Sequence, residues 1–315
     1  MTAIPSRRSG PTTLRTRLWV AAQTLFGLAA LTLLIIAVVR NWNETARVIA
    51  GLNGALVALS AALVLLGLYT NMLSWRQVVR ALGTRLTLAQ AGGIYFTSQL
   101  GKYLPGAVWP IVASTRLGLI AGMDAFQSIV AMSVALLMTL TVASILSVSG
   151  LFLLPVVAER YAIVPVIIIV AGIIALVPPV LDRLIRVALR LLRRASTVPR
   201  LAPVPLAAAV GWCVLSWLLL GVSLSVLIAA HHPARASDVF SGLPAYAVSW
   251  VAGFVAIFDP AGVGVREGVL VLVLGAHLGS PAVLGLAVVQ RTFLVLGDAI
   301  MFLIGLPGRR PRAAA

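Results

Sequence analysis

Charged residues are scarce in this chain, and acidic residues are the scarcest. Only 10% of the 315 residues are charged, 24 basic and 8 acidic, while 61% are hydrophobic and the mean hydropathy is +1.07. Soluble domains are about half apolar and about one quarter charged. The chain also lacks a polar stretch long enough for a separate globular domain. This composition excludes a water-soluble protein and predicts an all-α polytopic membrane protein.

Cysteine and other metal-binding residues are also rare. Cys213 is the only cysteine and lies in an apolar run, which excludes a disulfide framework and a cysteine-based metal site. His231 and His232 have no third ligand at metal-binding spacing. No Ser/His/Asp, metal-ligand or paired-carboxylate set stands at workable spacing. We therefore expect no metal, no cofactor and no enzymatic activity.

The excess of basic residues has two interpretations. A net charge of +16 is typical of nucleic-acid binding when the basic residues cluster on one face of a soluble domain. Here most arginines lie in short segments that flank apolar runs, where they set orientation by the positive-inside rule. We therefore expect membrane lipid and no nucleic acid as partner, and a multi-pass protein of the plasma membrane with both termini in the cytoplasm.

Several apolar runs reach the roughly 20 residues that a helix needs to cross the hydrocarbon core. A basic cytoplasmic tail at 1–14 precedes the first run, which ends without a small-residue cleavage site and so predicts an uncleaved signal anchor. A second cytoplasmic tail follows the last run at 307–315. The predicted full spans are residues 19–39, 52–74, 125–154, 161–181, 204–230 and 282–306.

Two further stretches, 86–122 and 238–280, are punctuated by glycine and proline, which break helices. Irregular backbone survives at membrane depth only where protein or a water-filled cavity covers it, so each stretch predicts a re-entrant hairpin of broken helices. Residues 15–157 and 160–306 then show the same order of elements with opposite sidedness. This order predicts an inverted repeat, as in many transporters. A basic amphipathic helix at 182–200 is expected to lie on the inner leaflet.

The first broken stretch contains Lys102, the only lysine of the chain, within Tyr-Phe-Thr-Ser-Gln-Leu-Gly-Lys-Tyr-Leu-Pro-Gly at 95–106. A cation inside the membrane usually faces a cavity or a partner, and half-helix N-termini add positive potential, so the segment suits an anion such as a phosphate. The alternative is a lysine that snorkels to the interface. The candidate substrate-binding residues of this segment are Tyr95, Ser98, Gln99, Lys102 and Tyr103.

The second broken stretch contains Phe-Asp-Pro-Ala-Gly-Val-Gly-Val-Arg-Glu-Gly at 258–268. Gly262 and Gly264 allow the backbone to approach a ligand closely, and the Arg266 guanidinium suits a phosphate. Glu267 does not face its helical neighbour Arg266, so it is expected to pair with another helix or to carry a coupling proton.

Two further charges stand in the last apolar run. Arg291 and Asp298 are seven residues apart and therefore lie on one helical face, where charges point inward. One interpretation is a structural ion-pair network with Asp259 or Glu267. The other is a role in the substrate path.

At the two broken segments the chain resembles the lysylphosphatidylglycerol synthase transmembrane family, a flippase-like membrane domain that occurs fused to aminoacyl-phospholipid synthases and alone. The resemblance rests on the 95–106 motif and on Gly-Val-Gly-Val-Arg-Glu-Gly at 262–268. It implies lipid translocation between leaflets, with Lys102 and Arg266 near the headgroup path. It also implies a stand-alone member without the soluble synthase domain, so no aminoacyl transfer is expected.

The leading functional hypothesis is a flippase for an anionic lipid, which would be a phospholipid, an aminoacyl-phospholipid or a polyprenyl-linked lipid. The alternative is a membrane scaffold that binds a lipid-modifying enzyme or a glycosyltransferase and moves nothing itself. The sequence leaves open a lipid-biosynthetic enzyme partner and a homo-oligomer.

Overall fold

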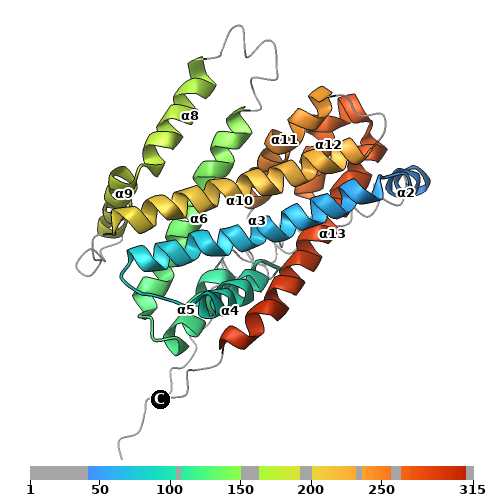
Figure 1. Cartoon of the computed structure of the whole chain (residues 1–315). Helices are drawn as coiled ribbons and strands as arrows, with labels where there is room; N and C mark the ends of the chain where they lie inside the picture. Colours follow the sequence, from blue (N-terminus) through green and yellow to red (C-terminus); the bar gives the residue numbers. More distant parts are fainter. Residues whose placement is uncertain are drawn as a thin grey trace, which may run out of the picture.

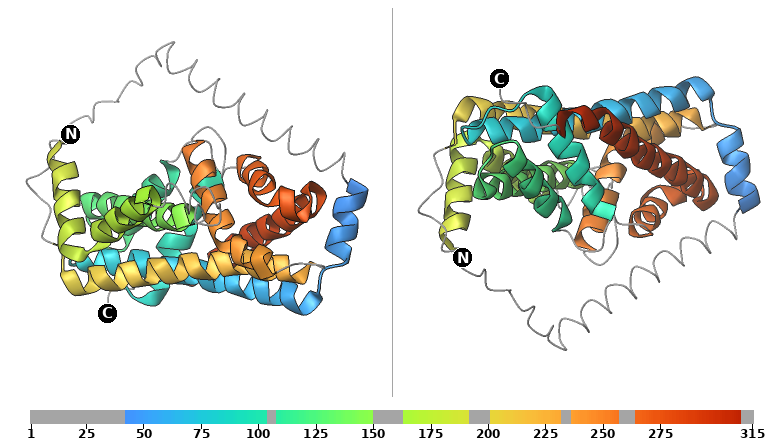
Figure 2. Two further views of the ribbon diagram at one scale, coloured as in Figure 1. Left: turned by 90° about the horizontal axis from the view of Figure 1, so that it is seen from above. Right: turned by 90° about the horizontal axis from the view of Figure 1, so that it is seen from below.

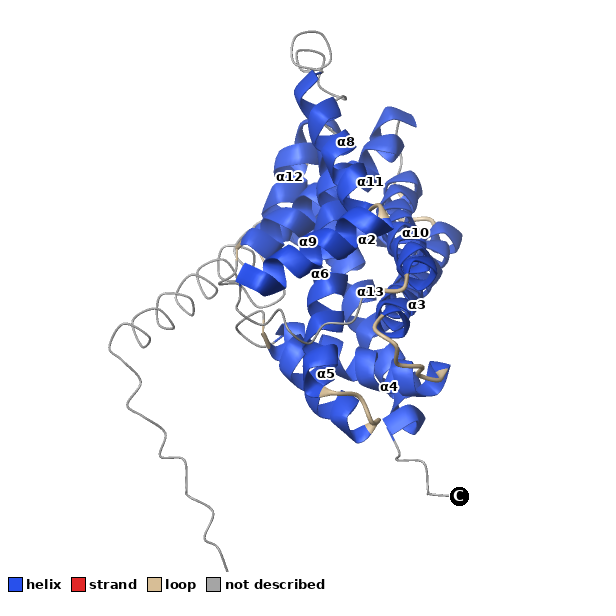
Figure 3. Cartoon of the chain, turned by 90° about the vertical axis from the view of Figure 1, so that its left-hand side faces the viewer, coloured by secondary structure: helices blue, strands red, loops and turns tan. Residues whose placement is uncertain are grey.

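The computed structural model describes residues 42–103, 108–149, 163–191, 201–231, 236–256 and 264–309. Every regular element in these ranges is helical, and none is a strand (Figure 3). In chain order (Figure 1) the elements are α2 (Trp42–Ala50), α3 (Gly54–Ala81), α4 (Leu88–Gln99), the 3-10 helix η1 (Leu100–Tyr103), α5 (Trp109–Ile120), α6 (Ala125–Ser149), α8 (Ile163–Leu176), α9 (Pro178–Leu191), α10 (Pro203–Ala230), α11 (Ala236–Val255), α12 (Val265–Leu278), α13 (Ser280–Gly305) and η4 (Leu306–Arg309).

Five described helices are long and apolar enough to cross a membrane: α3, α6, α10, α11 and α13. A sixth span is reached if α8 and α9 count as one bent pair. The all-α polytopic class predicted from the sequence is therefore confirmed. The first predicted span, 19–39, and both predicted tails apart from 307–309 lie outside the described residues.

The structure corrects the predicted span at 161–181. Helix α8 ends at Leu176, and the chain turns by 85° into α9. Pro178 and Pro179 explain the early end, because proline lacks an N–H donor and disfavours helical geometry in the residue before it. The predicted interfacial helix at 182–200 accordingly begins earlier, at Pro178, and its described part ends at Leu191.

Helices α3 and α10 run side by side along their whole lengths and form one side of the bundle (Figure 1). Their contacts recur every seven residues in antiparallel register. The Asn53 N–H donates to the Ala230 carbonyl at one end, and the Ala202 N–H donates to the Ala81 carbonyl at the other. Between the ends, Ser60 pairs with Ser223, Gly67 with Ser216 and Ser74 with Ala209. Small residues at this spacing let two membrane helices approach closely.

These contacts are symmetric about the contact of Gly67 with Ser216. If α3 and α10 exchange places, the hydrogen bond from Asn53 to Ala230 takes the position of the bond from Ala202 to Ala81. The α2 helix lies across one end of the pair and α9 across the other (Figure 2). Helix α4 packs on α13, and its counterpart α11 packs on α6. An inverted repeat requires these reciprocal pairs, although the boundaries 15–157 and 160–306 stay a prediction.

Enlarging Gly67 should destabilise the pair formed by α3 and α10. An added Cβ would lie 2.8 Å from Cγ and Cδ2 of Leu220, closer than real side chains approach. Overpacking of this kind destabilises a protein by about 1–3 kcal/mol. Gly67→Ala should therefore lower the thermal unfolding midpoint in detergent. Gly211→Ala on α10 is the matched control, because nothing lies within 4 Å of its added Cβ; equal midpoints for the two variants would contradict the packing assigned to Gly67.

The stretch 86–122 is a pair of short helices, as predicted. Thr87 caps α4, because its side-chain hydroxyl accepts the Gln90 N–H. In return, the Gln90 side-chain oxygen accepts the Thr87 backbone N–H. Helices α4 and α5 have 12 residues each, too few to cross the hydrocarbon core alone. Gly101 lies where η1 meets α5, and an added Cβ would lie 2.9 Å from the Pro110 nitrogen. Only glycine allows the two limbs to meet this closely.

The stretch 238–280 is also interrupted, but its limbs are unequal. Helix α11 has 20 residues and qualifies as a span by length, so the predicted half-helix is too short. Helix α12 has 14 residues and is short enough for a re-entrant limb. Gly279, at φ +82°, then turns the chain from α12 directly into α13.

Candidate functional site

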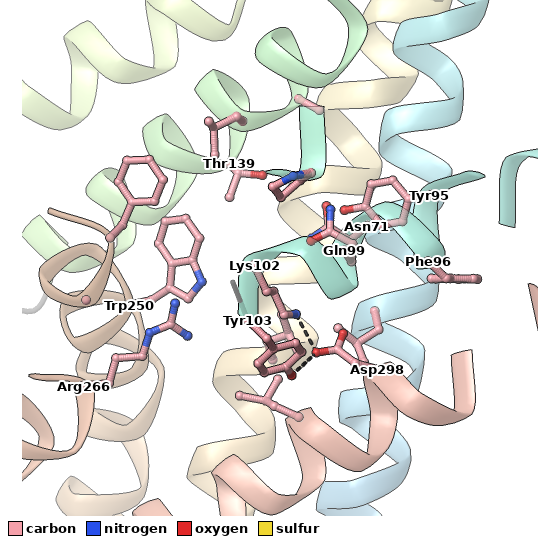
Figure 4. Close-up of a pocket in the computed structure, with 18 of the residues that line it drawn as sticks. Asn71, Tyr95, Phe96, Gln99, Lys102, Tyr103, Thr139, Trp250, Arg266 and Asp298 are labelled. Atoms are coloured by element: carbon pink, nitrogen blue, oxygen red, sulfur yellow. Dashed lines mark hydrogen bonds and ion pairs between the residues drawn. The ribbon is translucent and has the colours of Figure 1, made fainter. Parts of the chain in front are cut away.

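A cavity of about 230 Å³ lies between the two predicted repeats (Figure 4). Its wall includes α3, α4, η1, α5 and α6 from the first half and α10 to α13 from the second. Both broken stretches therefore reach the same space. Most of the wall is apolar, and the charged residues on it are Lys102, Arg266, Arg291 and Asp298.

Lys102 joins the two halves through Asp298. Its Nζ lies 2.6 Å from Oδ2 of Asp298 on α13, and the Tyr103 hydroxyl donates to the same oxygen at 2.5 Å. The Asp298 side chain is only 5% exposed, so these two donors replace the water that a carboxylate needs. Lys102 therefore points into the protein and does not snorkel to the interface.

Arg266 faces Lys102 from the opposite side of the cavity (Figure 4). It stands in the first turn of α12, and its guanidinium carbon lies 5.5 Å from the centre of the Trp250 ring. Its Nε is buried and has no hydrogen-bond partner among the described residues. An unsatisfied buried donor of a cation is costly and suits an anionic acceptor.

Gly253 on α11 allows Arg266 to lie in this position. A Cβ added at Gly253 would lie 2.6 Å from Cγ and 2.8 Å from Nε of Arg266. The arginine side chain therefore crosses α11 where no side chain stands in its way.

Gly253→Ala should displace Arg266 from the cavity while leaving its charge in the chain. Loss of one hydrogen bond to a charged group is worth about 1.5–3 kcal/mol, so affinity for an anionic ligand should fall about tenfold or more. Titration of purified protein with phosphatidylglycerol, followed by intrinsic tryptophan fluorescence, measures the change. Gly268→Ala is the control, since its added Cβ meets nothing within 4 Å. Unchanged affinity in Gly253→Ala would contradict this role of Gly253.

The described cavity wall carries a net positive charge. Arg291 lies on α13 two turns before Asp298, and both line the cavity, as their seven-residue spacing predicts. Lys102, Arg266 and Arg291 provide three positive charges against the single carboxylate of Asp298. The site therefore has the electrostatic character of an anion-binding cavity.

Comparison of the whole sequence with known families also indicates a membrane protein. The family described as the lysylphosphatidylglycerol synthase TM region matches residues 22–302, nearly the entire chain. The chain belongs to this family. A comparison with curated proteins finds no match. No soluble synthase domain is evident in the 315 residues. The apolar helices and the family together identify a multi-pass membrane protein linked by its family to lipid metabolism.

The structure brings together most of the residues that the family motifs single out. Tyr95, Gln99, Lys102, Tyr103 and Arg266 all line the cavity. Asp298 pairs with Lys102, a partner that the sequence did not predict for it. The predicted network of Arg291 and Asp298 with Asp259 or Glu267 stays a prediction, because Asp259 lies outside the described residues.

Three predicted binding residues stand outside the cavity wall: Ser98, Gly264 and Glu267. Ser98 is fully buried and donates to the Ile94 carbonyl within α4. Glu267 accepts the Gly264 N–H at 2.7 Å and so caps the first turn of α12. A carboxylate at a helix N-terminus is stabilised by the helix dipole, which explains this buried position. Asp259 and Gly262, also predicted, lie outside the described residues.

Among the lining residues that sequence reasoning missed, four have side chains that can form hydrogen bonds: Asn71, Thr139, Tyr246 and Trp250. A signal existed for the two aromatic residues, since Tyr246, Trp250 and Phe254 recur every four residues and form one face of α11. Asn71 and Thr139 stand in apolar spans that also contain other polar residues, such as Thr70 and Thr141, so nothing in the sequence singled them out.

Proposed function

We propose that this protein translocates an anionic lipid between the leaflets of the plasma membrane by binding its headgroup in the cavity between the two repeats. The observation that carries the proposal is the gathering of Lys102, Arg266 and Arg291 in one intramembrane cavity with Asp298 as the only described carboxylate on its wall. Each cation at the bilayer centre is unfavourable by about 2.5–3.5 kcal/mol on insertion scales. An anionic headgroup offsets that penalty.

The size of the cavity supports binding of a headgroup and not of a whole lipid. Pockets for drug-sized ligands are about 300–1,000 Å³, and this cavity is smaller. A phosphate with a small substituent fits such a space while the acyl chains stay in the bilayer. The reciprocal packing of α4 on α13 and α11 on α6 gives two halves that can rock around the cavity, as in transporters built from inverted repeats.

Reconstitution tests this proposal. Proteoliposomes containing a tail-labelled fluorescent phosphatidylglycerol are treated with a membrane-impermeant quencher, and the fraction of label that becomes accessible is measured. We expect the protein to expose inner-leaflet label, whereas empty liposomes keep it protected. If the folded protein leaves the label protected yet co-purifies stoichiometrically with a lipid-modifying enzyme, the scaffold function replaces transport. We also propose that the chain acts by binding and moving lipid and not by catalysis.

A further inference from the structure

The chemistry of the cavity wall selects among anionic lipids. We propose that this cavity takes a headgroup whose only charge is negative and whose remainder carries uncharged hydroxyls, such as phosphoglycerol, and that it discriminates against the aminoacylated headgroup named in the family description. The inference rests on the proposed function and deepens it. A lysyl ester brings ammonium groups whose charge exceeds that of the phosphate, so it needs acceptors on the wall.

The described wall has no carboxylate to offer an ammonium group. Asp298 is its single acidic residue, and Oδ2 of Asp298 already accepts from both Lys102 and Tyr103. The Asp298 side chain is almost completely buried, so an incoming ammonium would have to displace Lys102. The displaced lysine would then be an unpaired cation in the membrane, which is unfavourable.

Two aromatic residues of the wall, Tyr103 and Trp250, already lie beside cations of the protein. An ammonium group without a carboxylate is often held over an aromatic face. Here Arg266 lies over Trp250 at 5.5 Å, and Phe254 stacks on the same Trp250 ring at 5.4 Å. Lys102 lies 5.5 Å from the Tyr103 ring centre. At these two rings the protein's own cations therefore take the position that an ammonium group would use.

Uncharged polar groups fill the other part of the wall. The side chains of Asn71, Gln99 and Tyr95 lie together beyond Lys102, on the side away from Arg266 (Figure 4). Thr139 also lines the cavity. Amides and hydroxyls both donate and accept hydrogen bonds, and so they match the hydroxyls of a polyol. A phosphate between Lys102 and Arg266 would place its hydroxylated substituent near these groups.

Native mass spectrometry of the full-length protein tests the inference without requiring transport. The protein is incubated with equal amounts of phosphatidylglycerol and lysyl-phosphatidylglycerol of the same acyl composition. We expect phosphatidylglycerol to be retained at least about tenfold more, a ratio that corresponds to the loss of one charge-assisted contact. Equal retention, or preference for the lysyl lipid, would overturn the inference.

A charge reversal provides a second arm. Arg266→Glu adds a carboxylate to the wall and should shift the ratio toward the lysyl lipid, whereas Arg183→Glu on the exposed face of α9 should leave it unchanged. Flipping of the two lipids then separates the two proposals. Selective binding without flipping removes the transport function and keeps the selectivity, while equal flipping of both lipids removes the selectivity and keeps the transport function.

Discussion

Arg266→Ala is expected to reduce translocation of phosphatidylglycerol by at least about tenfold in proteoliposomes. The guanidinium is buried, and the Nε donor has no hydrogen-bond partner among the described residues, so a bound phosphate would supply its acceptor. Hydrogen bonds to charged groups are worth about 1.5–3 kcal/mol, and each 1.4 kcal/mol is about a factor of ten. The variant should still fold, because the removed side chain lines a cavity and its Nε holds no hydrogen bond among the described residues.

Two controls accompany this variant. Arg266→Lys keeps the charge but loses the planar fork, so it should recover only part of the activity. Arg183→Ala removes an exposed arginine of α9 and should leave translocation unchanged. If Arg266→Ala moved lipid at the rate of the unmodified protein while Tm stayed constant, Arg266 would have no part in headgroup binding.

Breaking the Lys102 to Asp298 ion pair should produce the largest loss of stability. Lys102→Ala leaves the Asp298 carboxylate buried with Tyr103 as its remaining described donor. Removing one partner of a fully buried pair destabilises a protein by about 3–5 kcal/mol, and we expect a loss below that range because the Lys102 side chain is 33% exposed. The double variant Lys102→Ala/Asp298→Ala removes both charges and should recover most of that stability. The thermal unfolding midpoints of the unmodified protein, Lys102→Ala and the double variant are compared in nanodiscs.

The chain contains a matched surface pair for comparison. Arg186 and Asp182 on α9 form an i,i+4 ion pair at 2.5 Å within one helix. The two cations are equally exposed, at 33%, but the Asp182 side chain is 13% exposed whereas that of Asp298 is 5% exposed. Helical pairs of this kind contribute about 0.3–0.5 kcal/mol, so Arg186→Ala should have little effect. Two results would contradict a buried pair between the two halves. One is a similar loss of thermal stability in Lys102→Ala and Arg186→Ala, and the other is a double variant that is no more stable than Lys102→Ala.

Hydropathy and charge predicted much of the fold. The span predicted at 204–230 matches α10 to within one residue, because apolar length and flanking basic residues define it. Both broken stretches were predicted from glycine and proline. The length of α11 was not, because the helix continues through Gly253, a residue type that usually punctuates a helix and that was interpreted as part of the break.

The site was predicted in its residues but not in its pairings. Rare charges in apolar stretches identified Lys102, Arg266 and Asp298 without any knowledge of the fold. The Lys102 to Asp298 pair depends on how α4 packs on α13, and hydropathy contains no information about such long-range packing. The capping role of Glu267 was hidden because Gly264 has no side chain, so the usual capping-box sequence is absent.

The most direct test of the central claim is a cryo-electron microscopy map of the protein in nanodiscs that contain phosphatidylglycerol. The account predicts density for a phosphate in the cavity, within hydrogen-bonding distance of Lys102 and Arg266, with acyl chains leading out to the bilayer. A map that shows lipid only around the outer surface of the bundle, with the cavity empty in every class of particles, would contradict it.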